Sequence, residues 1–463
     1  FAPSGTAEVF RLLRREGARL VSVFGSVDAQ ESKFVQYVVE TSTQEYRVIP
    51  VQVEGALPSA TSITPAAAWY EREVHDRYGV TFEGHPDPRP LLSHEGEYQF
   101  LEVDGIGVCE VPVGPVHAGI IEPGHFRFSV VGDTILNLEL RHFYTHKGTE
   151  KLFEGTPVAN GAIIAESVSG DNCFAHAVAY SQAVERAYGL EAPTRAQAIR
   201  LVGQELERMI AHIADVGALC GDVGFTVPAA YTSRLKETLL REFADVLGTR
   251  HWRAIAIPGG IRKDLSMEGA QRLQKVTANV ARDFAEIAQM ILDTPSVQNR
   301  FESTGILRPV VARDFAVVGP VARASGVKLD VRHDHPYGAY RNHTVEPLTY
   351  RYGDVFARAR VRIDETAASA KLIGEVLENL PTGAMLVAID RQANTTGFSA
   401  VESPRGELLY WIDIAGNVIR RCHIKSPSFQ NWPAMPWTMP GNIIADFPLI
   451  NKSFNLSYSG CDR

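Results

Sequence analysis

Residues 195–218 read RAQAIRLVGQELERMIAHIADVGA, and apolar side chains recur through this stretch at the spacing of an amphipathic helix. Similar patterns occupy residues 174–188, 230–247, 268–292 and 356–380. Helices of this length, gathered in one region, favour a helical bundle as the core of a large domain. Around this core we expect peripheral short sheets, with strands at 125–131, 385–389, 407–412 and 417–424.

The N-terminal part of the chain has a different pattern. It predicts a helix over 6–16 and strands over 20–24, 34–40 and 46–53, and the pair Thr64-Pro65 opens a second helix that stops at Gly79. A loop rich in proline follows at 82–90, and the pattern changes again near residue 105. We therefore predict an α+β protein with two domains: a small α/β domain over 1–105 and a mainly helical domain over 106–463.

Composition excludes several classes of protein. The chain has 463 residues, 46 Lys plus Arg against 54 Asp plus Glu, and a net charge of −8, which argues against a nucleic-acid partner. Its five cysteines are scattered and never spaced C-x-x-C, so we expect neither a disulfide scaffold nor a compact four-thiolate cluster. No apolar run approaches the ~18 residues of a membrane helix, and the first residues lead us to expect no secretory signal. We expect a soluble, cytoplasmic chain without its own transmembrane segment, reaching a membrane only through partners.

Histidines mark two candidate sites. His142 and His146 are spaced i, i+4, and Glu150 follows four residues later, so one helix face could either bind a divalent metal or serve as a polar face. His117 and His125 flank a turn that contains Glu122, a pattern that suits proton transfer, polar-ligand binding or a purely structural role.

Two arginine-containing segments leave alternatives open as well. The cluster RHDHPY at 332–337 could shuttle protons or join two domains. Arg405 lies in the loop PRGE just before a predicted strand, where it could extend over a cavity or form an ordinary ion pair. The chain has no G-x-G-x-x-G, P-loop or G-x-S-x-G motif, so nucleotide-binding and hydrolase folds have no support.

The order of the motifs along the chain is more specific than any one of them. WYEREVHDRYG at 69–79 and GHPDPR at 84–89 resemble the signature of the C subunit of respiratory complex I. From Gly114 on, the chain is similar to the large subunit of group 4 membrane-bound [NiFe] hydrogenases, which are relatives of the complex I D subunit. The fused order resembles that of formate hydrogenlyase large subunits. The matching segments are GPVHAGIIEPGHFRF (114–128), YTHKGTEK (144–151), FAHA (174–177), ARASG (322–326), DVR (330–332), ESPRGE (402–407) and NLSYSGCDR (455–463).

The hydrogenases of this family hold nickel and iron through two C-x-x-C pairs. By the resemblance, Ser169, Asn172, Ser457 and Gly460 occupy those four positions, whereas Cys173 and Cys461 each fall one residue late. Nickel and iron in such a site need soft thiolate ligands, which a hydroxyl, an amide and a glycine cannot replace. The chain thus resembles the cysteine-less, Ech-hydrogenase-related type, for which we expect no metal and no hydrogenase activity. If the fold brings the two displaced cysteines together, they could instead hold another metal or form a bridge.

The resemblance also implies a setting. The chain would be a large peripheral subunit on the cytoplasmic side of the cell (inner) membrane. Its partners would be an iron–sulfur small subunit and membrane antiporter-like and anchor subunits. Electrons would come from the partner's clusters, with a quinone as a candidate acceptor and with ion translocation coupled to the transfer. The chain itself would bind no cofactor, and NAD enters only by association with the family. Complex I has a quinone-binding tyrosine where this chain has Ser167.

Roles by motif position complete the prediction. Arg323, Asp330 and Arg332 would hold the domain core. Two alternatives to this redox function stay open: the chain could be a non-catalytic structural or assembly subunit, or an active hydrogenase with atypical ligands. The residues assigned to proton relay or catalysis are His117, Glu122, His125, His146, Glu150 and Arg405, and those expected to line the cavity are Ser167, Cys173, His176, Asp330, Arg332 and Cys461, with His142 beside them.

Overall fold

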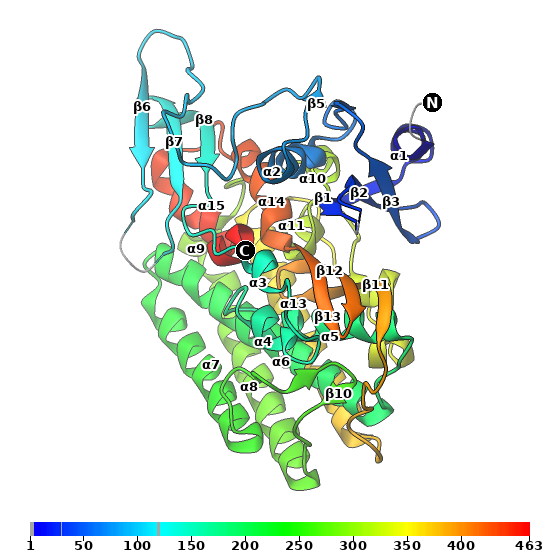
Figure 1. The fold of residues 1–463 in the computed structure, drawn as a ribbon. Coiled ribbons are helices and arrows are strands. Elements are labelled where there is room, and N and C mark those ends of the chain that lie inside the picture. Colours follow the sequence, from blue (N-terminus) through cyan, green and yellow to red (C-terminus); the bar gives the residue numbers. More distant parts are fainter. Residues whose placement is uncertain (1–3, 29, 118–120) are drawn as a thin grey trace.

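The computed structural model describes residues 4–28, 30–117 and 121–463. Four long helices form the centre of the large domain: α6 (Thr194–Asp222), α7 (Thr226–Leu247), α8 (Met267–Asp293) and α13 (Val355–Glu378). Helices α6 and α8 each contact both α7 and α13, so the four close into a bundle (Figure 1). The predicted helices are confirmed to within a few residues at each end.

The N-terminal domain is a small antiparallel sheet covered by helices. Strands β1 (Arg19–Val27), β2 (Lys33–Glu40) and β3 (Tyr46–Gln52) pair in that order, after helix α1 (Ser4–Arg15). A 3₁₀ turn, η1 (Pro65–Ala67), leads into α2 (Ala68–Tyr78), and Gly79 ends this helix with a φ of 67°. Short strands β4 (Leu57–Pro58) and β5 (Phe82–Glu83) pair in parallel. The predicted α+β class is confirmed.

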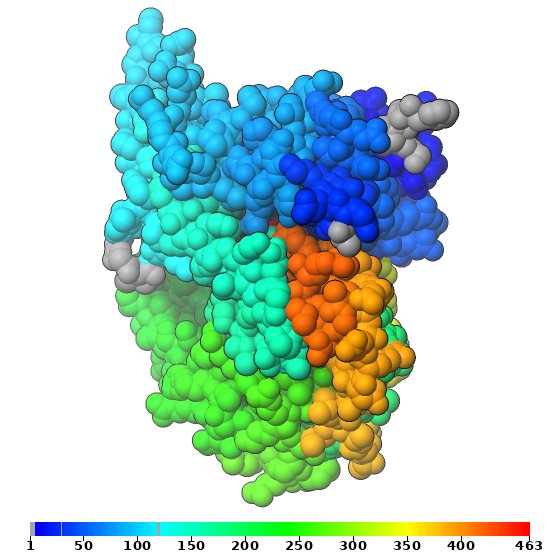
Figure 2. Space-filling view, in the orientation of Figure 1, coloured from blue at the N-terminus to red at the C-terminus, as the bar shows by residue number. Residues whose placement is uncertain are grey.

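A second sheet projects from the body of the molecule. It consists of β6 (Val108–Val113), β7 (His125–Val131) and β8 (Thr134–Arg141), seen in cyan at the upper left of Figure 2. The predicted helix face carrying His142, His146 and Glu150 is wrong, because β8 runs up to Arg141 and the chain then turns. Phe143 has a φ of 69° and Gly148 a φ of 64°, so helix α3 (Thr149–Leu152) starts only beyond them.

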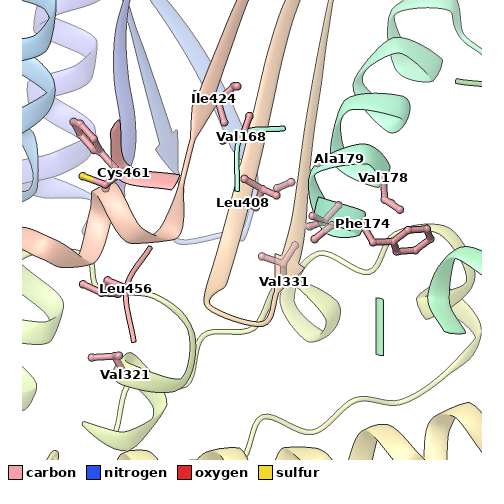
Figure 3. Packing of buried hydrophobic residues seen from close by; sticks show 14 of the residues in the cluster. Val168, Phe174, Val178, Ala179, Val321, Val331, Leu408, Ile424, Leu456 and Cys461 are labelled. Atoms are coloured by element: carbon pink, nitrogen blue, oxygen red, sulfur yellow. The ribbon is translucent and has the colours of Figure 1, made fainter. Parts of the chain in front are cut away.

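A third sheet lies against helix α5 (Cys173–Tyr188). Its strands are β11 (Ala393–Ser403), β12 (Gly406–Gly416) and β13 (Val418–Lys425), and nine consecutive residues of β12 are buried. Figure 3 shows Phe174 and Val178 of α5 on one side of these strands and Leu456 and Cys461 on the other. The strand predicted at 385–389 is wrong, since this segment forms only a single bridge from Leu386 to Gly260.

Shorter elements complete the fold. They are α4 (Gly161–Glu166), β9 (Ala256–Ile257), β10 (Gly260–Ile261), α9 (Pro295–Phe301), α10 (Pro309–Asp314), α11 (Gly319–Ala324), α12 (Val331–Asp334), η2 (Gly338–Asn342), α14 (Pro427–Asn431), η3 (Trp432–Thr438), η4 (Ile444–Asp446), α15 (Phe447–Phe454) and α16 (Tyr458–Asp462).

The two predicted domains pack directly on each other. Val21, Phe24 and Val38 of the N-terminal sheet form one buried cluster with Leu409 and Trp411 of β12. The predicted boundary near residue 105 falls between β5 and β6. Within the part of the chain that the structure describes, no helix has both the length and the apolar character needed to span a membrane.

Candidate functional site

A cavity of about 610 Å³ lies where the β6–β7 connection, the loop before α5 and the segment from α15 to α16 meet. Its wall contains both signs of charge together with hydroxyl and amide groups. Five residues singled out from the sequence line it: His117, Glu122, Ser169, Arg405 and Ser457. The structure thus brings together side chains that are far apart in the sequence, His117 and Ser457 being 340 residues apart.

Arg405 is the central cation of this site. Its Nη2 lies 2.6 Å from Oδ2 of Asp171, and its Nε donates to the backbone carbonyl of Asn455 at 2.5 Å. The turn between β11 and β12 brings it there. Gly406, the first residue of β12, has a φ of 124°, and a Cβ on it would lie 2.6 Å from the backbone nitrogen of Gly319, so only glycine fits. The side chain of Arg405 is buried at 7% exposure, and Nη1 has no hydrogen-bond partner among the described residues.

By the motif resemblance, Ser169, Asn172, Ser457 and Gly460 stand at the positions of the four hydrogenase cysteines, and three of them, Ser169, Ser457 and Gly460, form a hydrogen-bonded group. The hydroxyls of Ser169 and Ser457 lie 2.9 Å apart, and the Ser457 hydroxyl accepts the backbone N–H of Gly460 at 2.9 Å. Asn172 is buried immediately before α5. This set does not fit a nickel–iron centre, because it offers no thiolate and the two hydroxyls already bond to each other. Among the described residues, no group of three or more His, Cys, Asp or Glu side chains is arranged to hold a metal ion.

The two displaced cysteines lie apart from this group. Cys173 is the first residue of α5, and its thiol contacts the backbone carbonyl of His251 at 3.4 Å. Cys461 is fully buried in α16, and both thiols are free. Burial raises the pKa of each thiol above its ordinary value, so both stay protonated at neutral pH.

His117 and Glu122 belong to the cavity in different ways. Nε2 of His117 is buried and has no partner among the described residues, so it is free to bond a ligand. Glu122 is exposed, and its carboxylate accepts the backbone N–H of Ser459 at 2.6 Å. Glu122 therefore ties the β6–β7 connection to the C-terminal segment.

The other predicted histidines are packed into the protein away from the cavity wall. His125 bonds the carbonyl of Gly114 through Nδ1, and His176 contacts the Tyr410 hydroxyl at 2.8 Å. His142 lies among aromatic rings, 4.3 Å from that of Trp432 between centroids. Burial lowers the pKa of His142 and of His176 to about 3, so both imidazoles are neutral.

Glu150 and His146 are separated from the cavity as well. The Glu150 carboxylate accepts from Arg421 at 2.9 Å and lies 3.0 Å from Nδ1 of His423. Burial alone would raise its pKa, but Arg421, Arg77 and His423 outweigh burial and hold it well below its usual range. His146 bonds the backbone carbonyl of Asp462 through Nδ1. Glu150 is therefore a charged member of an ion network at neutral pH.

Asp330 and Arg332 form part of another buried ion network. Arg332 lies 2.6 Å from Asp330 and 3.0 Å from Glu205 of α6, and Arg323 lies 2.8 Å from Glu402 of β11. This arrangement joins α12, α6 and β11. Six residues expected at the cavity lie elsewhere among the described residues, in the core or, for Ser167, at the surface: Ser167, Cys173, His176, Asp330, Arg332 and Cys461.

Several cavity residues have no sequence signal of their own. Asp171 lies in a glycine-containing loop, and the sequence of that loop does not predict its ion pair with Arg405. The same holds for the other polar side chains of the wall, which come from α6, α15 and the adjoining C-terminal segment: Asp222, Asn451, Lys452, Asn455, Tyr458 and Ser459. The motif NLSYSGCDR marks the segment but not these roles.

Comparison with known proteins places the chain. Residues 1–101 match the 30 kDa subunit of respiratory-chain NADH dehydrogenase, and residues 222–396 and 391–463 match its 49 kDa subunit. Formate hydrogenlyase subunit 5 of Escherichia coli is 32% identical, over 98% of this chain and 86% of the relative. The chain therefore belongs to the family of the 30 kDa and 49 kDa subunits of respiratory-chain NADH dehydrogenase. The resemblance read from the sequence motifs, a C-plus-D fusion related to group 4 hydrogenase large subunits, is thereby confirmed.

Two further comparisons, one with a relative by sequence and one with a solved structure, extend this result. NADH-quinone oxidoreductase subunit 4 of Thermus thermophilus is 30% identical, over 77% of this chain and 94% of the relative. The solved structure of the membrane-bound sulfane sulfur reductase, described as an archaeal respiratory membrane complex, contains a chain with a TM-score of 0.73 and 24% identity. It covers 77% of this chain and 99% of that one, and it shows that the two share a fold.

Proposed function

We propose that this chain is the large peripheral subunit of a membrane-anchored, complex I-like redox complex, and that an acceptor is reduced in the cavity at Arg405. One observation carries the proposal. The buried guanidinium of Arg405, paired with the exposed Asp171, lines a polar cavity of about 610 Å³ that has Ser169 and Ser457 in its wall, two positions that by the resemblance correspond to cysteines of [NiFe] hydrogenases. The chemistry of this subunit is then that of a metal-free pocket of charges and hydrogen-bond donors.

The side chains of the cavity suit the reduction of an acceptor that carries oxygen atoms. Arg405 and Lys452 stabilise the negative charge that develops on such an acceptor as electrons arrive. Burial raises the pKa of Tyr458 to about 12, so its phenol remains a donor. The free Nε2 of His117 offers a second contact for orienting the acceptor. A quinone, with two carbonyl oxygens on a compact ring, fits this set of donors.

The rest of the complex supplies what the chain lacks. Electrons come from iron–sulfur clusters of a small partner subunit, and antiporter-like and anchor subunits hold the assembly at the cytoplasmic face of the membrane and move ions. The similarity to an NADH-quinone oxidoreductase subunit and to a chain of a respiratory membrane complex supports this assignment.

The test uses the native complex in membrane vesicles. Its clusters are reduced with dithionite, excess reductant is removed, and decylubiquinone is added while cluster reoxidation is followed by absorbance. Substituting Arg405→Gln should slow reoxidation about 100-fold, the scale of losing one electrostatic contact to the reacting group. Arg420→Gln is the matched control, because this arginine is 41% exposed, lies 2.7 Å from Asp413 and does not line the cavity.

The alternatives give other results. For a structural or assembly subunit, Arg405→Gln would leave reoxidation unchanged while complex yield falls. An active hydrogenase with atypical ligands would reduce a viologen under dihydrogen. Either result would overturn the proposal.

A further inference from the structure

A second chamber of about 330 Å³ lies behind the cavity, between the start of α5 and helices α6 and α7. Its walls are mostly apolar and aromatic, and they include Phe174, Leu240, Phe243 and Trp252. Arg250 and His251, which are exposed, also line it, so the chamber reaches the surface of the protein.

The two spaces meet at the Arg405–Asp171 pair. Four residues line both of them: Gly170, Asp171, Arg405 and Asn455. This ion pair, with its arginine buried and its aspartate 38% exposed, therefore stands between the chamber and the cavity in which we place the acceptor.

The carboxyl group of Glu207, on α6, lines this chamber and forms no ion pair with another described residue. Its two oxygens accept the backbone N–H groups of Phe174 and Ala175, at 2.8 and 3.0 Å, at the first turn of α5. Asn172, the residue before that helix, makes no capping bond with its side chain, so Glu207 takes over the role. No basic side chain pairs with Glu207 among the described residues.

These surroundings stabilise both protonation states of Glu207. Burial in an apolar wall favours the neutral acid and raises its pKa to about 8, against the opposing effect of the two N–H groups. The same N–H groups, at the positive end of α5, receive the anion once the proton has left. Asp171 pushes the pKa upward and Arg208 pulls it downward. The other charged or titratable groups lining the chamber are Asp215, Lys236, Arg250, His251 and Arg405.

We propose that Glu207 supplies the protons that the acceptor consumes, passing them across the Arg405–Asp171 pair and regaining them from solvent through the second chamber. This inference rests on the proposed function of the cavity. In each step the O–H bond of Glu207 breaks and the Asp171 carboxylate accepts the proton. Asp171 then passes the proton to the acceptor, while the acceptor takes up an electron from the partner's clusters. A proton from solvent then restores the Glu207 acid, so the residue itself is neither oxidised nor reduced.

Infrared spectroscopy of the native complex tests the carboxyl group itself. The wild-type complex should show a protonated carboxyl band at pH 7 that disappears above about pH 8 and is missing from Glu207→Gln. Other buried carboxyls, such as Glu71 with a pKa raised by burial to about 7, remain in both spectra and cancel in the difference. A band unchanged by the substitution would overturn the proposal.

Quinone-driven reoxidation of the clusters tests the role of the proton. Glu207→Gln should lower the maximal rate about 100-fold and leave the apparent KM for decylubiquinone unchanged, whereas Glu207→Asp restores part of the rate. Glu242→Gln is the matched control, since this carboxyl is buried on α7 and pairs with Arg272. A wild-type rate in Glu207→Gln together with a slow Arg405→Gln would overturn the proton role alone. A wild-type rate in Arg405→Gln would overturn the proposed function.

Discussion

Glu150 is fully buried, with its carboxylate between Arg421, His423 and Arg463. Because its pKa is lowered in the folded state, the stability it contributes is complete above its unfolded pKa of about 4.5 and is lost as pH falls through the folded value. Glu150→Gln leaves buried cations without a counter-charge, and we expect a loss of about 3 kcal/mol at pH 7. Urea unfolding at pH 7 and pH 4 measures it, and the deficit should shrink at pH 4. An unchanged stability with reduced turnover would instead indicate a relay role.

His142 is a neutral imidazole among aromatic rings, with both ring nitrogens unpartnered among the described residues. Its folded pKa of about 3 lies below the unfolded value, so the unfolded chain binds the proton first and stability falls as pH drops from about 6.5 toward 3. His142→Phe removes this penalty. We expect the variant to gain about 2 kcal/mol over wild type between pH 7 and pH 5, measured by thermal unfolding. The same pH dependence in both proteins would contradict the assignment.

Helices α6 and α7 approach each other closely at Gly217. A Cβ there would lie 1.9 Å from the hydroxyl oxygen of Thr232, whereas a Cβ at Gly221 of the same helix would meet nothing within 4 Å. We expect Gly217→Ala to lower the free energy of unfolding by about 2 kcal/mol through overpacking. Gly221→Ala should be neutral or stabilising by up to about 1 kcal/mol. Chemical denaturation of both variants checks this, and equal stabilities would show that the crossing can adjust.

At this scale the sequence predicts helices well, because the 3.6-residue period of α6 or α8 is set by neighbours along the chain. Strand β11, with the sequence ANTTGFSAVES, has no alternating pattern and depends on its pairing with β12, so it escapes prediction. His142 and His146 have the i, i+4 spacing of a helix, but they lie in the turn between β8 and α3 and do not share a helix face. Arg405 could be singled out by its motif. Its partner Asp171, 234 residues away, could not, and neither could Glu207, because both depend on tertiary packing.

At the scale of the whole molecule, a further ion cluster joins the N-terminal sheet to the large domain. Arg19 of β1 reaches Glu407 of β12 at 2.6 Å, and the fully buried Glu407 also binds Lys425 at 2.6 Å. We expect Arg19→Met to cost about 3 kcal/mol and to expose the N-terminal sheet to hydrogen exchange before the helical bundle. Arg47→Met, at an exposed arginine paired with Glu45, should change stability by less than about 0.5 kcal/mol. Equal loss of protection in both domains would show that this contact does not hold them together.

The central claim is that this large subunit works in a redox complex without a nickel–iron centre. Elemental analysis of the purified complex, in the state that reoxidises its clusters with decylubiquinone, tests it most directly. The account predicts iron in the amount that the partner's clusters require and nickel far below one atom per complex. One nickel per complex, lost together with turnover when Ser169 and Ser457 are changed to alanine, would contradict it.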